Sequence, residues 1–422
     1  MNYEKIFMGS VSLHVITTDK FKTNTMETIF RSKLDNNITI RNLLKTVLMD
    51  SNMKYKTERD FVKETENLYD LKIVSSFSRI GNDTTISFKT RFLDEKYTEE
   101  GMNAESISFY LDTIFNPLVV DSSFNKDVVN KCKKKIEKSI ISLTDNKLKY
   151  ALLNLFQTAK DMPYSNSSYG KIEELNNIDE HKLYEYYKKM LKEDTVDILF
   201  IGNIDASTLK EMLKDKLKIS TYKKERNDIL VKELPLTKRV KTASLEDNTN
   251  QTQLTMLYAL HNLTDFERKY VIRVYNEILG GSACSMLFDD VREKNSLCYY
   301  INADVKPYDN ILFIYSGISY KNKDKVVKLI KKTLSNIEKG KISDDVFTSA
   351  KETITSSIIA SMDNPSGILN TYYAKDLVGS ALFEERIEAF NKVTKEDVVK
   401  VSKKLKLYSI FTLGKESNNE KD

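Results

Sequence analysis

Histidine and cysteine, the residues that most often bind metals or act as nucleophiles, are scarce in this chain of 422 residues. The three histidines are His14, His181 and His261, which lie in three distant segments. No two are four residues apart, the spacing that places two imidazoles on one face of a helix around a zinc ion. Each histidine is therefore interpreted as an isolated surface or core residue, and together they predict no metal site.

The cysteines, Cys132, Cys284 and Cys298, are three in number and do not form a disulfide framework, so a reducing compartment is expected. Cys298 could act as a nucleophile, but no histidine accompanies it in the sequence, and a buried thiol is the simpler interpretation. The pair Gly280-Gly281 ends a predicted helix, whereas a phosphate-binding loop would begin one. It is therefore interpreted as a helix C-cap.

Arg292 and Tyr299 are better candidates for binding or catalytic contacts than the histidines and cysteines. An arginine fork grips carbonyl or carboxylate oxygens, and a tyrosine hydroxyl is a neutral donor. Such donors lower a reaction barrier by a few kcal/mol when they point at developing negative charge. Spacing alone leaves plainer roles open, because Arg292 could complement a helix C-terminus or pair with Asp289, and Tyr299 could be an ordinary strand residue.

The sequence around this pair resembles the second-domain signature of the pitrilysin/insulinase-type zinc metallopeptidases, the inverzincins. Residues 279–288 read Leu-Gly-Gly followed by Ser and Leu-Phe, and residues 291–299 carry Arg-Glu ahead of Leu-x-Tyr. The resemblance covers nearly the whole chain, although Ser296 stands where the family usually has glycine. It implies that Arg292 and Tyr299 bind the substrate backbone and help stabilise the oxyanion at a zinc site in the other domain or a partner chain.

The same resemblance predicts that the chain has no zinc site of its own. Active members carry H-x-x-E-H on their first long helix, where both histidines bind zinc and the glutamate activates water. The corresponding residues here are Asn42, Lys45 and Thr46. Asparagine and threonine are not normal zinc ligands, and a lysine cannot act as a carboxylate base and repels a cation. The family's third ligand, a glutamate, cannot be placed on the helix predicted over residues 125–144.

The resemblance therefore implies a non-catalytic, peptide-binding subunit without a cofactor. Two-domain members of the family can work as heterodimers, in which one chain supplies zinc and the other supplies the Arg/Tyr half. The expected partner is a zinc-bearing pitrilysin-type subunit, or a second copy of the chain, and the expected substrate is an extended peptide added to a sheet edge. Two alternatives stay open: a scaffolding homologue with no role in peptide processing, and an autonomous peptidase with an unrecognised metal site.

Apolar periodicity predicts an interleaved series of strands and helices. The predicted strands cover residues 11–17, 72–78, 84–93 and 196–201, then 254–260, 297–305, 311–318 and 407–413. In the first half, helices are predicted to begin at residues 39 and 57 and to cover 125–144, 147–159 and 178–191. In the second half, they are predicted to cover 264–281 and 395–404 and to begin at residues 323 and 343. This order predicts an α+β fold of two tandem homologous domains, each one sheet covered by helices. The resemblance implies that both sheets are mostly antiparallel.

A short internal match supports the duplication, because residues 139–146 align without gaps to residues 357–364. In both places the match ends a long predicted helix and precedes another. A polar, charged stretch separates the halves and is interpreted as a linker. The predicted domains are residues 1–215 and 241–422, with the linker at 216–240.

Composition excludes several classes of protein. Hydrophobic residues make up 41% of the chain and charged residues 30%, which excludes a disordered or fibrous chain. The net charge of +5 comes from well-mixed signs without a basic stripe, so nucleic-acid binding is not expected. No apolar run approaches the roughly 18 residues of a membrane helix, so no membrane association is expected. The polar start at Met1 shows no signal peptide, and a cytoplasmic location is expected.

Overall fold

The computed structural model describes residues 1–160, 165, 167–217, 228–229 and 231–415. They form two compact units, each assembled from separate stretches of the sequence. Unit 1 contains residues 1–141, 168–229 and 363–378, and unit 2 contains residues 142–167, 230–362 and 379–422. Among the described residues, no helix combines the length and the apolar character that crossing a membrane requires.

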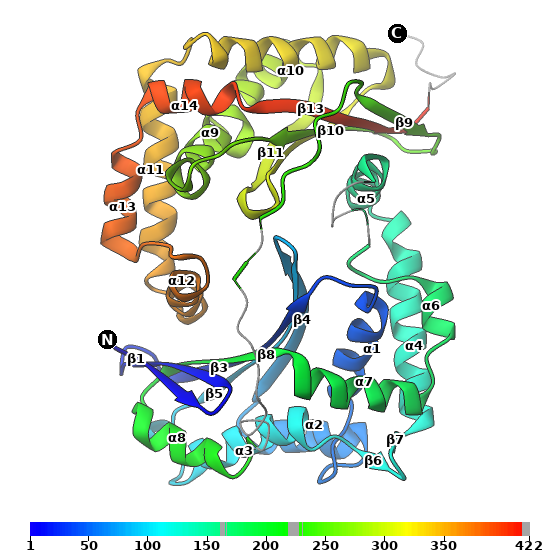
Figure 1. Ribbon diagram of the computed structural model, residues 1–422, viewed down its shortest axis with the longest axis vertical. Helices are drawn as coiled ribbons and strands as arrows, with labels where there is room; N and C mark the ends of the chain where they lie inside the picture. The colour runs from blue at the N-terminus through cyan, green and yellow to red at the C-terminus, as the bar shows by residue number, and fades with distance from the viewer. Residues whose placement is uncertain (161–164, 166, 218–227, 230, 416–422) are drawn as a thin grey trace. The chain divides into compact units, whose positions relative to one another are not determined.

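The sheet of unit 1 has six strands in the order β1-β2-β8-β3-β5-β4 (Figure 1). Their bounds are β1 (Asn2–Met8), β2 (Val11–Thr17), β3 (Thr23–Lys33), β4 (Lys72–Ile80), β5 (Asp83–Leu93) and β8 (Thr195–Gly202). Strands β2 and β8 run parallel, and every other neighbouring pair is antiparallel. All eight residues of β8 are buried, as expected for a central strand with both faces covered.

Helices complete unit 1 and close its hydrophobic core. They are α1 (Ile38–Leu48), α2 (Glu58–Asn67), α3 (Met102–Phe115), α4 (Lys126–Ile141), α6 (Ile172–Asn176), α7 (Glu180–Glu193), α8 (Ala206–Lys214) and α12 (Pro365–Val378). As predicted, α2 begins after Thr57, whose side chain accepts a hydrogen bond from the backbone of Asp60. The core joins apolar side chains of α1, including Leu43 and Leu44, to the buried side chains of the sheet.

The sheet of unit 2 has five strands in the order β11-β12-β10-β13-β9. Their bounds are β9 (Lys241–Leu245), β10 (Thr252–Leu260), β11 (Cys298–Lys306), β12 (Ile311–Ile318) and β13 (Leu405–Leu413). Strands β13 and β9 are parallel, and the other neighbouring pairs are antiparallel. The order and directions match those of β4-β5-β3-β8-β2 in unit 1, so the two sheets have the same topology. The predicted α+β fold of two similar, mostly antiparallel sheets is confirmed.

The helices of unit 2 include one long segment, residues 267–281, which joins β10 to β11. Its parts are the π-helical turn η5 (Glu267–Val271), α9 (Ile272–Asn276) and the π-helical turn η6 (Glu277–Gly281). The predicted capping box is present, because Thr264 and Glu267 each accept a hydrogen bond from the other's backbone N–H. The remaining helices are α5 (Lys147–Ala159), α10 (Lys323–Glu338), α11 (Asp344–Ser361), α13 (Phe383–Asn391) and α14 (Lys395–Ser402).

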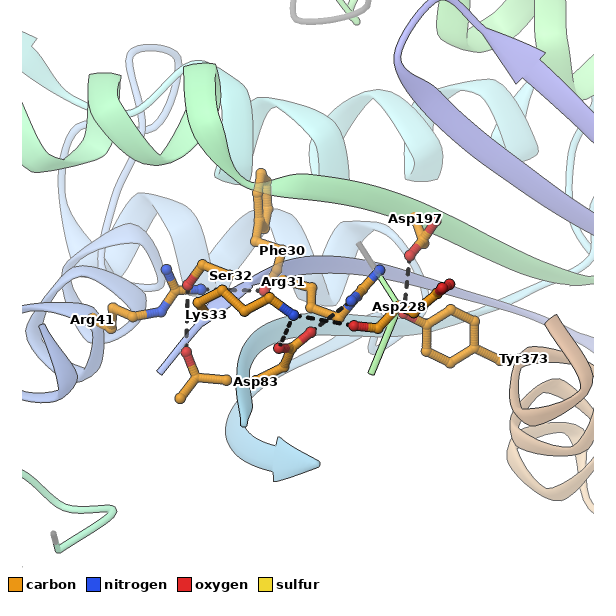
Figure 2. Close-up of polar contacts among 10 residues, drawn as sticks. Phe30, Arg31, Ser32, Lys33, Arg41, Asp83, Asp197, Asp228 and Tyr373 are labelled. Atoms are coloured by element: carbon orange, nitrogen blue, oxygen red, sulfur yellow. Dashed lines mark hydrogen bonds and ion pairs between the residues drawn. The ribbon is translucent and has the colours of Figure 1, made fainter. Parts of the chain in front are cut away.

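Two equivalent helices are exchanged between the halves of the sequence. Helix α5 follows residues 139–146 but packs in unit 2, where Phe156 meets Phe313 edge-on at 5.5 Å between ring centroids. Helix α12 follows residues 357–364 but packs in unit 1, where the Tyr373 hydroxyl donates to Asp197 Oδ2 at 2.9 Å (Figure 2). The compact units are therefore not continuous in sequence, and the domain boundaries at residues 215 and 241 stay a prediction.

Candidate functional site

Helix α1 carries the residues at the positions of the zinc motif and is fixed to the sheet of unit 1 by a buried arginine. The Arg41 guanidinium donates to the carbonyl oxygen of Phe30 at 3.2 Å (Figure 2) and forms an ion pair with Asp194 Oδ2 at 2.8 Å. Burial alone would lower the pKa of Arg41, but Asp194 and the Tyr186 hydroxyl outweigh it and raise the pKa. The charged contacts therefore hold α1 in one orientation.

A second charged cluster lies on the sheet beside this anchor. Asp83 is buried and accepts from Arg31 Nη1 at 2.6 Å and from Lys33 Nζ at 2.8 Å (Figure 2). Lys33 also donates to the backbone carbonyl of Asp228 at 3.1 Å. These contacts join β3 to β5 and satisfy the buried carboxylate, so we interpret the cluster as a structural feature of the sheet.

The side chains of Asn42 and Thr46 are used for backbone hydrogen bonds. Asn42 is buried, and its Nδ2 donates to the carbonyl oxygens of Ile38 at 3.0 Å and Ser168 at 2.8 Å. Thr46 Oγ1 donates to the carbonyl oxygen of Asn42 at 2.8 Å. These hydrogen bonds fix the Asn42 amide and the Thr46 hydroxyl against backbone carbonyl oxygens, a role in helix packing that needs no metal ion.

Lys45 lies between these two residues on α1 and is half-buried. Burial lowers the pKa of its ammonium group. Across the described residues, Lys45 has no ion pair with a carboxylate, and no three His, Cys, Asp or Glu side chains gather as metal ligands. The position that the resemblance assigns to the catalytic glutamate therefore holds a cation without a carboxylate partner among the described residues.

Gly170 lies directly against the start of α1. A Cβ atom at Gly170 would lie 2.7 Å from Thr39 Oγ1 and 2.9 Å from Thr39 Cα, and the backbone φ of Gly170 is +86°. Only glycine fits such a close approach in the left-handed region without strain. The backbone N–H of Lys171 donates to Thr39 Oγ1 at 3.1 Å, which completes the contact. This packing accounts for the glycine at position 170.

Arg292 lies in the π-helical turn η7 (Phe288–Glu293) of unit 2 with 45% of its side chain exposed. Its guanidinium stacks over the Phe288 ring at 4.8 Å from the centroid, and Nε lies 3.9 Å from a carboxylate oxygen of Glu293. The alternative pairing with Asp289 does not occur, because Asp289 pairs with Lys294 at 2.5 Å. Helical π turns are rare and often occur at functional sites.

Tyr299 is the extra residue of a β-bulge in β11. Cys298 lies opposite Ile318 and Tyr300 lies opposite Gly317, so Tyr299 has no partner residue on β12. Its side chain is 62% exposed. Strand β11 is at the edge of the sheet and has one neighbour, β12, among the described strands. The bulge thus presents an exposed phenol at an open sheet edge.

The turn between Arg292 and Tyr299 keeps its shape despite the serine. Ser296 takes a left-handed φ of +50°, and its N–H donates to the carbonyl oxygen of Arg292 at 2.9 Å. Burial raises the pKa of the Cys298 thiol, while a hydrogen bond with Ser316 and the Arg292 cation partly offset this effect. A thiol with a raised pKa is a poor nucleophile, which agrees with the simpler interpretation of Cys298.

The structure gives Gly280 a role that the sequence did not indicate. The helix of residues 267–281 ends at Gly281, as predicted. A Cβ atom at Gly280 would lie 2.8 Å from the backbone nitrogen of Ala303 on β11. Gly280 therefore lets the helix approach the strand that carries Tyr299. Close packing against a strand 23 residues away leaves no local sequence signal beyond the glycine itself.

The predicted site residues lie in separate units. Arg292 and Tyr299 are at the two ends of one turn in unit 2, and Asn42, Lys45 and Thr46 are on α1 in unit 1. Arg292 and Tyr299 are both exposed enough to reach a ligand. Their roles remain predictions.

Comparisons with known proteins agree with this architecture. A sequence model of the family described as "Peptidase M16 inactive domain" matches residues 177–354. The chain is 24% identical over 416 residues to "Probable inactive metalloprotease YmfF" of Bacillus subtilis, with 96% of each chain covered. It is also 24% identical over 414 residues to "Uncharacterized zinc protease YmxG" of the same species, which covers 91% of this chain and 95% of the relative.

Solved structures show the same fold. A conserved protein from Enterococcus faecalis superposes with a TM-score of 0.91 at 26% sequence identity, over 99% of this chain and 100% of that chain. A peptidase M16 inactive domain from Pseudomonas fluorescens superposes with a TM-score of 0.78 at 16% identity, over 98% of both chains.

The fold and the sequence signature are similar to those of two-domain proteins of the pitrilysin/insulinase type. In sequence and fold the chain resembles members of the peptidase M16 family. The match to the inactive-domain model and the similarity to the probable inactive relative support a non-catalytic role.

Proposed function

We propose that the chain is the peptide-binding, non-catalytic subunit of an M16-type peptidase. In this proposal Arg292 and Tyr299 complete a composite site whose zinc ion and catalytic glutamate come from a zinc-bearing partner subunit. The observation that carries the proposal is the β-bulge, which exposes the Tyr299 phenol at a sheet edge beside the Arg292 turn.

The chemistry of the two side chains supports this role. The Tyr299 hydroxyl can donate to a peptide carbonyl oxygen, and the Arg292 fork can hold a carbonyl or a carboxylate. Both contacts strengthen as negative charge develops on the attacked carbonyl. The outer edge of β11 provides backbone groups that an extended peptide can pair with.

We propose that zinc is held only by the partner subunit, and that this chain has no cofactor. The Lys45 ammonium, which has no carboxylate partner among the described residues, supports this view, as do the packing hydrogen bonds of the Asn42 amide. Metal analysis of the purified chain is the test. Stoichiometric zinc together with peptidase activity in the isolated chain would instead show an autonomous peptidase. We also propose a cytoplasmic location, which the three unpaired cysteines support.

Reconstitution with a zinc-bearing relative tests the composite site. Hydrolysis of an extended peptide should require both chains. Arg292→Ala and Tyr299→Phe should each reduce kcat of the mixture by about 100- to 1000-fold, the range for loss of one oxyanion donor. Arg59→Ala, which removes an exposed arginine of α2, is the control and should leave the rate unchanged. Unaltered hydrolysis with both site variants would refute the assignment.

A scaffolding role is the second candidate. The fold superposes with a TM-score of 0.73, at 16% identity, on a chain from "Complex III2 from Candida albicans, Inz-5 bound", over 98% of this chain and 95% of that chain. A peptide-binding titration separates the two functions. A peptide-binding subunit should show saturable binding that Arg292→Ala weakens, and a scaffold should show none.

A further inference from the structure

Several basic side chains lie on elements that pack near Tyr308 in unit 2, at the opposite end of β11 from Tyr299. Arg268, Lys269 and Arg273 lie on the helical segment of residues 267–281, and Arg386 lies on α13. Tyr308 belongs to the short turn η8 (Pro307–Asp309) between β11 and β12. We call these five residues the Tyr308 cluster.

Packing contacts bring the elements of the Tyr308 cluster together. Arg268 Nη1 donates to the carbonyl oxygen of Pro307 at 2.7 Å, which ties the helical segment to the turn. The rings of Tyr270 and Phe390 meet edge-on at 5.2 Å between centroids, which joins the segment to α13. Arg273 lies three residues after Tyr270 in the segment, and the Arg386 guanidinium lies 5.9 Å from the centroid of the Phe390 ring, so this ring pair joins the two elements that carry the arginines.

Two of the four cations already have partners. Lys269 forms an ion pair with Asp265 at 2.8 Å and donates to the carbonyl oxygen of Gly379 at 2.9 Å. Arg268 is held by its contacts with Pro307 and the side chain of Asn310. The remaining positive charges belong to Arg273 and Arg386.

Arg273 and Arg386 have no anionic partner within the part of the chain that the structure describes. Neither guanidinium forms an ion pair or hydrogen bond there, and Arg386 only lies 5.9 Å from the centroid of the Phe390 ring. Both side chains are half-buried. Partial burial of a charge costs free energy unless it is paired, and like charges placed together add to that cost.

The electrostatics agree with this arrangement. Burial lowers the pKa of Arg273, and the neighbouring Arg386 cation lowers it further. Burial also lowers the pKa of Arg386. Tyr308 supplies no charge in return, because burial raises its pKa although three cations of the cluster act in the opposite direction. No carboxylate of the described residues pairs with either arginine, and an external anion can balance their charge.

We propose that Arg273 and Arg386 form a binding site for an oxyanion of the phosphate class. Each guanidinium offers a planar fork of N–H donors that matches phosphate oxygens in pairs. The two positive charges balance the roughly −1.5 to −2 of a phosphate monoester near neutral pH. The ligand is free inorganic phosphate or the phosphate group of a small metabolite. The site is independent of the proposed peptide-binding function, because it contains neither Arg292 nor Tyr299.

Titration of the full chain with inorganic phosphate tests the site. Calorimetry and thermal unfolding are measured in phosphate and in sodium chloride of the same ionic strength. Phosphate should raise the unfolding temperature above the chloride value. Arg273→Gln and Arg386→Gln should each weaken phosphate binding by about tenfold or more, whereas Arg59→Gln should bind as the wild type does.

The same variants separate binding from folding. Without phosphate, each glutamine variant should unfold at the wild-type temperature or above, since it removes one of two like charges. Glycerol phosphate added in parallel identifies the source: tighter binding than inorganic phosphate indicates a metabolite, and equal or weaker binding indicates the free ion. Equal unfolding temperatures in phosphate and chloride, or undiminished binding by both glutamine variants, would overturn the proposal.

Discussion

Ser296 illustrates how one residue controls the geometry between Arg292 and Tyr299. Its left-handed φ of +50° is a conformation that costs a non-glycine residue about 1–2 kcal/mol. The turn keeps its backbone hydrogen bonds to Arg292 and Val291. The protein therefore tolerates a local cost in this turn, at the position where the resemblance predicts glycine.

Ser296→Gly should stabilise the chain by about 0.5–1 kcal/mol, because glycine removes the left-handed cost but has more freedom in the unfolded chain. Urea unfolding measures the change. Ser296→Ala is the matched control, since alanine retains the Cβ atom and should give no gain. A loss of stability in the glycine variant would show that the serine hydroxyl contributes more than the strain costs.

Lys45 gives a pH-dependent prediction, because burial lowers its pKa from the usual 10.5. Below the lowered pKa the Lys45 ammonium is charged in both the folded and the unfolded chain, so the folded chain bears the full cost of desolvating the charge. Between the lowered pKa and 10.5 the unfolded chain binds more protons, and the cost disappears as pH rises. Lys45→Met should therefore be more stable than the wild type at pH 7.

Paired urea unfolding of the wild type and Lys45→Met, at neutral pH and near the unfolded pKa, measures this difference. The advantage of the variant should shrink at the higher pH. Lys63→Met, at a surface position of α2, is the control and should show no such trend. A constant difference across the pH range would indicate that the effect comes from apolar packing alone.

At the scale of elements, helix α1 depends on the buried pair of Arg41 and Asp194. Arg41→Met removes the arginine from its ion pair with the buried carboxylate and should cost about 3–5 kcal/mol. The double variant Arg41→Met/Asp194→Leu should recover most of that loss, because no buried charge remains. Chemical denaturation of the single and double variants measures both values, and equal losses in the two would contradict the argument.

The approach of the segment 267–281 to β11 depends on Gly280. Gly280→Ala would place Cβ 2.8 Å from the Ala303 nitrogen and 2.9 Å from its Cβ atom, so the helix must move. We expect a loss of about 1–3 kcal/mol and weaker peptide binding, because the displaced strand carries Tyr299. Gly340→Ala is the control for loss of a glycine, because the nearest atom to an added Cβ is 3.8 Å away. This variant should cost only the strain of an alanine in the left-handed region.

Elements with a clear period could be predicted from the sequence, and those with mixed patterns could not. The strand over residues 11–17 and the helix over 147–159 have their predicted bounds. Strand β3 was missed because it carries charged residues that become buried. Glu27 pairs with Lys89 at 2.7 Å and Arg31 pairs with Asp83, partners that lie more than 50 residues away. Strand β1 and helices α3 and α8 were also missed.

The same limit applied at the candidate site. The signature around Arg292 and Tyr299 indicated which residues to examine, but not the β-bulge. A bulge is a property of the register between β11 and β12, which depends on the turn and the partner strand. The sequence likewise gave no sign that Arg273 and Arg386 share one location, because they are 113 positions apart and on different elements.

At the scale of the molecule, neither half of the sequence contains all the elements of one unit. Separate fragments of residues 1–229 and 230–422 should therefore each fold poorly, because each lacks its exchanged helix. An equimolar mixture should recover cooperative unfolding, measured by thermal denaturation and circular dichroism. If fragment 1–229 alone unfolded as cooperatively as the intact chain, α12 would not be needed for unit 1.

The exchange of α5 and α12 between the two units indicates an evolutionary origin for the chain. A polypeptide of half this length, with one sheet and one such helix, would leave an apolar face in contact with water unless a second copy supplied the cover. Exchange of identical helices between two copies is domain swapping, a low-cost route to a closed dimer. Fusion of two copies of the gene would then yield one chain in which each half of the sequence supplies a helix that packs in the other unit.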